Sequence, residues 1–179
     1  VTFTSLSGGI VTGSATSNVD VGGLVLPRTT DGSETVTGSG VFNSDEAVKR
    51  FVDAKIVIDP DDTNQVGDDH TFTATVFADD GSGTDADGVM GNYDAVGAGE
   101  DVAISLVDSN GAVSVASTPL AGLTDASGQF SVTFTSLSGG IVTGSATSNV
   151  NVGGLVLPRT TDGSETVTGS GVFNSDEAV

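Results

Sequence analysis

An almost perfect internal repeat constrains this chain more than any other feature. The segment 132–179 repeats the segment 1–48 with a single difference, Asn151 in place of Asp20, so the period is 131. Solenoid repeats have units of roughly 20 to 50 residues, which cannot bury a core alone. The period found here is long enough for a whole domain. The repeat therefore predicts tandem domains, and its near-identity indicates recent duplication within a longer array.

The duplicated block is out of phase with the strand pattern. The alternating run Gln-Phe-Ser-Val-Thr-Phe is complete at residues 129–134, whereas Val1 enters the same run in its middle. We therefore expect the chain to continue past Val179 with Lys-Arg-Phe-Val-Asp, as it does after Val48.

The local pattern is that of β-strands throughout. The chain has 26 Gly and is rich in Thr, Ser and Val, whereas strong helix formers are scarce. In residues 71–77, Phe72, Ala74 and Val76 alternate with threonines, which predicts one buried and one wet face. Phe130 and Phe134 are likewise expected in the core. Seven or more such strands per period predict an all-β fold of the sandwich type.

Two details of this fold are also predicted. The even positions of residues 142–152 are small or apolar and are expected to face inward, so that Asp20 and Asn151 face solvent. The turn residues at 108–111 predict a β-hairpin between residues 102–106 and 112–115. A period of 131 exceeds the roughly 100 residues of an immunoglobulin sandwich. We assign the excess to two Gly-rich acidic loops or short extra hairpins, residues 79–101 and 158–177.

A family resemblance adds to this interpretation. Residues 123–136 carry Thr-Asp-Ala-Ser-Gly before an alternating strand, and Gly139, Gly140 and Ala146 follow. This pattern resembles the bacterial immunoglobulin-like repeats of the invasin and intimin type, as do residues 64–73 and 48–58. The resemblance implies immunoglobulin-like tandem modules of a giant surface adhesin or extracellular fibre. It also implies a boundary near Asp53: residues 1–53 form the C-terminal part of one module, and 54–179 the next module without its last strand.

Charge and composition limit the partners. With 24 acidic and 5 basic side chains the formal charge is −19, which repels nucleic acid. No stretch has the length and apolarity of a membrane span, so no membrane insertion is expected of these residues. We expect an extracellular or cell-surface location. The chain's main partner would be itself, as neighbouring repeats or subunits of a filament, and any surface receptor or carbohydrate would bind through other domains.

The first acidic cluster is a candidate calcium site. Its seven carboxylates lie between positions 79 and 101, a segment without Lys or Arg, and carboxylates on Gly-rich turns can converge on a hard cation. The spacing does not satisfy the EF-hand pattern, so a solvated acidic loop is the alternative. The candidate ligands are Asp79, Asp80, Asp85, Asp87, Asp94 and Asp101, with Glu100 among them in sequence.

A second acidic cluster follows the strand at residues 55–58. A cation bound there could stiffen the angle between modules, and a polar turn after Pro60 is the alternative. Its members are Asp59, Asp61, Asp62, Asp68 and Asp69.

Catalytic signals are weak. His70 is the only histidine and the chain has no cysteine, so neither a zinc site nor a thiol nucleophile is indicated. Serines and aspartates are plentiful, but no nucleophile elbow surrounds them. We therefore expect a protein that is not an enzyme.

Three functions remain open. The leading hypothesis is a structural filament, built from modules of one giant chain or from many subunits. The second is the stalk of an adhesin that carries a binding domain elsewhere. The third is strand exchange, in which a segment of one subunit completes the sheet of the next.

Overall fold

The described part of the chain is built entirely from β-strands. The computed structural model describes residues 1–31, 44–82 and 93–162, and in these ranges it contains 13 strands and no helix. Those ranges therefore include no helix that could cross a membrane. The prediction of an all-β fold is confirmed.

The first large sheet is antiparallel and has five strands. Its order is β5-β6-β11-β9, and β7 pairs with the end of β6. β5 ends immediately before Pro60, as the sequence predicts. The strands are β5 (Asp53–Asp59), β6 (His70–Asp79), β7 (Asp94–Ala95), β9 (Ser114–Ala116) and β11 (Gln129–Ser136).

The second large sheet has four antiparallel strands in the order β10-β8-β12-β13. β12 is its longest member and joins both neighbours: its first two-thirds pair with β8 and its last part pairs with β13. The strands are β8 (Asp101–Ser109), β10 (Ala121–Leu123), β12 (Ile141–Val152) and β13 (Leu155–Thr160).

One core joins the two sheets, an arrangement consistent with a β-sandwich. Phe72 and Phe134 are buried as predicted, and Phe130 packs against the core while partly buried. The predicted inward face of β12 is confirmed, because its even positions from Gly144 to Val152 are all buried. Asp20 and Asn151 are both exposed, also as predicted. The buried apolar residues shared by the two sheets are Ala54, Ile56, Ile58, Phe72, Ala74, Val76, Val102, Ile104, Val132, Phe134, Ala146, Val150 and Val152.

The predicted hairpin between residues 102–106 and 112–115 is wrong, because these two segments do not pair with each other. The turn itself forms, since Asn110 and Gly111 both have positive φ and the N–H of Ala112 donates to the carbonyl of Ser109 at 3.1 Å. However, β9 pairs with β11 in the other sheet. After the turn the chain crosses to the edge of β11, where the N–H of Leu137 donates to the carbonyl of Val113 at 2.9 Å. The N–H of Ser114 donates to the carboxylate of Asp108 instead of to the backbone of β8.

A hairpin that we did not expect joins β12 to β13. Gly153 and Gly154 form its two-residue turn with φ of 58° and 84°. Gly-Gly between alternating apolar residues is a recognised hairpin signal. Pro158 is tolerated in β13 because β13 is an edge strand. The rest of the second predicted acidic loop, residues 163–177, lies outside the described residues, as do residues 83–92 of the first.

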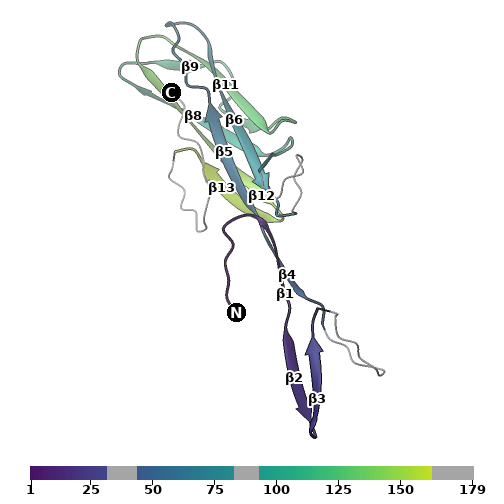
Figure 1. Cartoon of the computed structure of the whole chain (residues 1–179). Coiled ribbons are helices and arrows are strands. Elements are labelled where there is room, and N and C mark those ends of the chain that lie inside the picture. Colours follow the sequence, from purple (N-terminus) through teal and green to yellow (C-terminus); the bar gives the residue numbers. More distant parts are fainter. Residues whose placement is uncertain (32–43, 83–92, 163–179) are drawn as a thin grey trace.

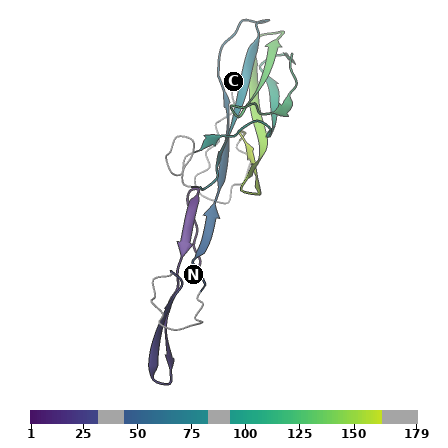
Figure 2. The ribbon, with the colours of Figure 1, turned by 90° about the vertical axis from the view of Figure 1, so that its right-hand side faces the viewer.

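The N-terminal residues form two small two-stranded sheets beyond one end of the large sheets. β1 (Gly9–Gly13) pairs with β4 (Ala47–Phe51), and β2 (Thr16–Val21) pairs with β3 (Leu24–Thr29). Both views show them extending the molecule along the direction of its strands (Figures 1 and 2). The chain passes directly from β4 to β5 through Val52, where the pairing partner changes from β1 to β6.

Candidate functional site

The described members of the first acidic cluster do not form a common site. Asp79 is buried at the end of β6, Asp80 is exposed beside it, Asp94 lies in β7 and Asp101 opens β8. Asp85 and Asp87 lie outside the described residues. Among the residues that are described, no group of three or more acidic, His or Cys side chains could hold a metal. Calcium at this cluster stays a prediction, and melting with and without a chelator would test it.

The local hydrogen bonds of this cluster involve its own turn. Hydrogen bonds from the side chain and backbone of Ser82 lower the pKa of Asp80, and the charge of Arg50 adds to the shift. The N–H of Gly81 donates to Oδ1 of Asp79 at 2.9 Å. Oδ2 of Asp79 is buried without a hydrogen-bond partner among the described residues.

The second acidic cluster lies at the end of the sandwich opposite Val52. Asp59 closes β5, and the other four members occupy the exposed connection from β5 to β6. A seven-residue strand spans about 23 Å, so these carboxylates are far from the Val52 junction. We expected them near a module junction, and the structure places them away from the junction at Val52.

A buried polar network lies instead beside Val52. Arg159 on β13 donates to Oδ1 of Asp53 at 2.8 Å and to the carbonyl of Ala54 at 2.6 Å. The hydroxyl of Tyr93 donates to Oδ2 of the same Asp53 at 2.6 Å. The ammonium of Lys55 lies 4.8 Å from the centroid of the Tyr93 ring. The network thus ties the first strand after the junction to the last described strand.

Burial and the hydrogen bond to Asp53 raise the pKa of Tyr93 well above its ordinary value of 10.0. The charges of Asp53 and Asp79 add to this rise. The sequence pattern did not indicate this network. The sequence offered one signal for it: Arg159, one of only 5 basic residues in the chain, follows Pro158 within an apolar strand-like run.

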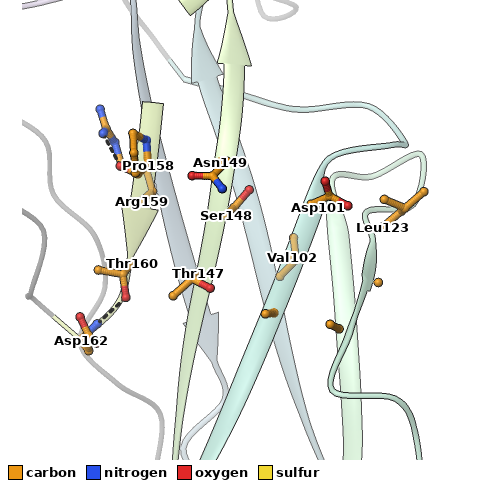
Figure 3. Close-up of a pocket in the computed structure, with 13 residues that line it drawn as sticks. Asp101, Val102, Leu123, Thr147, Ser148, Asn149, Pro158, Arg159, Thr160 and Asp162 are labelled. Atoms are coloured by element: carbon orange, nitrogen blue, oxygen red, sulfur yellow. Dashed lines mark hydrogen bonds between the residues drawn. The ribbon is translucent and has the colours of Figure 1, made fainter. Parts of the chain in front are cut away.

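An open groove of about 760 Å³ lies over the sheet β10-β8-β12-β13 (Figure 3). Its lining is largely apolar, with exposed Leu123 and Pro158 among it. It also carries the exposed polar side chains of Thr147, Asn149, Asp101 and Asp162. No His or Lys is among its described lining residues, and the side chain of Arg159 is engaged with Asp53. The described lining therefore offers a mainly apolar surface with scattered polar groups and no His or Lys that could act as a base.

His70 is held by structural contacts. Its Nε2 lies 3.3 Å from the carbonyl of Pro60, and its ring packs edge-on against Phe72 and Phe134. The nearby hydroxyl of Ser136 donates to the carbonyl of Ser138 at 2.8 Å. These contacts place His70 as a packing residue at the end of the sandwich.

Comparison of the chain with protein-family models, with curated proteins and with solved structures finds no significant match.

Proposed function

We propose that this chain is a stretch of a structural filament at the cell surface or outside the cell, built from tandem immunoglobulin-like modules. The observation that carries the proposal is the repeat itself: the segment 1–48 recurs as 132–179 with one exposed difference. A binding tip needs only one specialised module, whereas a fibre of constant geometry needs identical ones.

The elongated arrangement supports this proposal. The strands β1 to β4 and the sandwich lie one after the other along the molecule (Figures 1 and 2). The pairing partner changes at Val52, which supports a module boundary near Asp53. Residues 1–53 then belong to one module and residues 54–179 to the next.

The charge of −19 suits this role, because like-charged fibres repel one another and remain dispersed. The chain's principal partner in the proposal is a further copy of itself. The role requires no catalysis and no cofactor, and calcium would serve only to stiffen the fibre.

The alternative function is the stalk of an adhesin whose binding domain lies elsewhere in the chain. The same repeat supports it, since a stalk also needs uniform spacing. A divergent terminal domain in the full open reading frame would favour the stalk.

Electron microscopy of the native material, with mass determination after denaturation, tests the proposal. Ordered filaments with a constant axial repeat are expected. One very large mass would identify a giant chain, and a subunit-sized mass would identify assembly from many chains. Flexible single strings without a regular repeat would contradict the ordered filament.

A further inference from the structure

One segment of the repeat has a strand partner along its edge in the first copy, whereas no described strand lies along the same edge in the second copy. Residues 138–144 and residues 7–13 have the same sequence. In the first copy this segment contacts β4 and the turn that follows β6. Among the described residues, the edge of this segment is thus filled by a strand in the first copy and unfilled in the second, where Ser138 and Gly140 contact the turn at residues 109–112.

The filled version is closely packed. β1 pairs with β4 in the register Gly9↔Phe51, Val11↔Lys49 and Gly13↔Ala47. A Cβ placed on Gly8 would overlap the carboxylate of Asp79, and a Cβ on Gly81 would overlap the carbonyl of Phe51. The contact therefore leaves no room for a side chain at either glycine.

The unfilled version has a free strand edge. The N–H of Thr161 donates to the carbonyl of Ala146, so the backbone polar groups of Ala146 point away from β8. Orientation alternates from one strand residue to the next, so the backbone N–H and C=O groups of Gly144 and Val142 point to the same edge as those of Ala146. No described strand pairs with that edge over Ile141–Gly144, since β13 ends at Thr160 opposite Thr147. In the first copy the N–H of Thr30 donates to the carbonyl of Ala15 in the same way, and β4 continues beyond β3 along Gly9–Gly13.

The surroundings of the unfilled version form a groove of about 260 Å³ between the β5–β6 connection and the start of β12. A Cβ on Gly139 would meet no described atom within 4 Å, in contrast to Gly8. Asp62 and Asp68 line the groove.

Charge complementarity indicates the occupant. Three of the 5 basic residues of the chain, Lys49, Arg50 and Lys55, lie in β4 and β5. The rim of the groove is acidic. A strand with the sequence of β4, laid on the open edge, would bring its two cations to Ile141 and Val142, beside those carboxylates.

We propose that residues 138–144 are the docking surface for a further copy of residues 49–82, held in the register that β1 and β4 adopt. Phe51 of that copy would lie opposite Gly140 and Lys49 opposite Val142. The turn with the sequence of Asp79–Ser82 would cover Gly139. Each module would then meet the next at one fixed angle. This inference rests on the proposed function and deepens it.

Engineered cysteines test the register, because the chain has none of its own. The test protein carries residues 49–179 a second time after Val179. The test pair combines Val142→Cys with Lys→Cys at the appended copy of position 49. The matched control combines Val11→Cys with Lys49→Cys. Directly opposed strand residues lie within disulfide reach, whereas diagonal neighbours lie about 7 to 8 Å apart. Both pairs are expected to oxidise to the same extent within one chain, as shown by non-reducing gels and peptide mass spectrometry.

A pair that is out of register completes this experiment. Val142→Cys with Phe→Cys at the appended position 51 should crosslink weakly, as should Val11→Cys with Phe51→Cys. The inference would be overturned if only the control pair Val11→Cys with Lys49→Cys crosslinked. Equal crosslinking of the in-register and out-of-register pairs would overturn it as well. Ordered filaments could persist in either case, so failure of the register is distinguishable from failure of the proposed function.

The glycines provide a second, independent readout through tryptic cleavage after Lys49 and Arg50. Gly8→Val should accelerate cleavage there in the chain of 179 residues, and Gly139→Val should not. In the extended chain, Gly139→Val should accelerate cleavage at the appended copies of the same two residues. If Gly139→Val leaves cleavage of the extended chain unchanged while Gly8→Val raises it, the docking surface is not used.

Discussion

The two copies of the repeat have the same sequence and different environments. Phe134 is 5% exposed and Phe3 is 50% exposed, and the matching values are 0% for Val150 and 44% for Val19. Both copies nevertheless form the same local hairpin, with identical register across β12–β13 and β2–β3. The comparison separates two levels of structure. Strand, turn and register follow from local sequence, whereas burial depends on residues 53–131, which supply the facing sheet for the second copy.

The largest difference should appear when the same phenylalanine is truncated in each copy. Phe134→Ala removes a ring that packs at 5.0 Å from the ring of Phe72 in the core, and such truncations cost about 3 to 5 kcal/mol. Phe3→Ala removes mainly an edge-on contact with Phe51, worth about 1 kcal/mol or less. Urea unfolding of both variants measures the difference. Equal losses would break the comparison, because Phe3 would then be covered in solution.

The arginines provide the next test. Arg159 is paired with Asp53 in a buried site, whereas Arg28 donates to the carbonyl of its neighbour Pro27. Removing one partner of a buried ion pair costs about 3 kcal/mol or more, since the other charge is left without compensation. Arg159→Met should therefore lower the free energy of unfolding strongly and Arg28→Met hardly at all. Stabilisation by Arg159→Met would show that the pair serves specificity rather than stability.

The glycines at the start of the long strand should differ by a smaller amount. A Cβ on Gly144 would lie 2.5 Å from the ring of Phe72, whereas a Cβ on Gly13 would meet only the carbonyl of Ala47 at 3.9 Å. Overpacking a filled core costs about 1 to 3 kcal/mol. Gly144→Ala should thus destabilise the chain and Gly13→Ala should be nearly neutral. Thermal melts of the two variants give the ranking, and a neutral Gly144→Ala would mean that Phe72 can move aside.

Much of the fold could be predicted because alternation reports which face of a strand is buried. The inward face of β12 and the burial of Phe72 follow from period two alone. Pairing between strands was harder to predict. The turn at Asn110 and Gly111 has ordinary hairpin chemistry, yet the strand that follows it pairs with β11 and not with β8. The choice of partner strand depends on the whole sandwich, and no pattern within a local segment reveals it.

The candidate site was harder still. Acidic residues that are close in sequence diverge where a strand ends: Asp79 is the last residue of β6 and is buried, whereas Asp80 follows the strand and is exposed. The network of Asp53, Tyr93 and Arg159 joins residues up to 106 positions apart, and no local pattern connects them. The junction contacts of Gly8 and Gly81 are equally nonlocal.

Tyr93 offers a smaller test of that network by titration. It is the only tyrosine and the chain has no tryptophan, so phenolate absorbance reports on it alone. Its folded pKa is raised above the ordinary value of 10.0. The folded state therefore holds its proton longer than the unfolded state, and stability is fully present below pH 10 and falls as pH rises further. Tyr93→Phe should remove this alkaline loss and cost about 1 kcal/mol at neutral pH. Titration of the folded protein at the ordinary value would contradict the hydrogen bond to Asp53.

The smallest effect belongs to the one position at which the copies differ. Asp20 accepts a hydrogen bond from the N–H of Gly23 at 2.9 Å, and the amide oxygen of an asparagine can accept the same bond. Both positions are exposed, and such surface changes usually alter stability by less than about 0.5 kcal/mol. Asp20→Asn and Asn151→Asp should therefore leave the unfolding midpoint nearly unchanged. A large loss in Asn151→Asp alone would show that the β12–β13 hairpin meets an acidic neighbour in solution, because only there would the added charge be repelled.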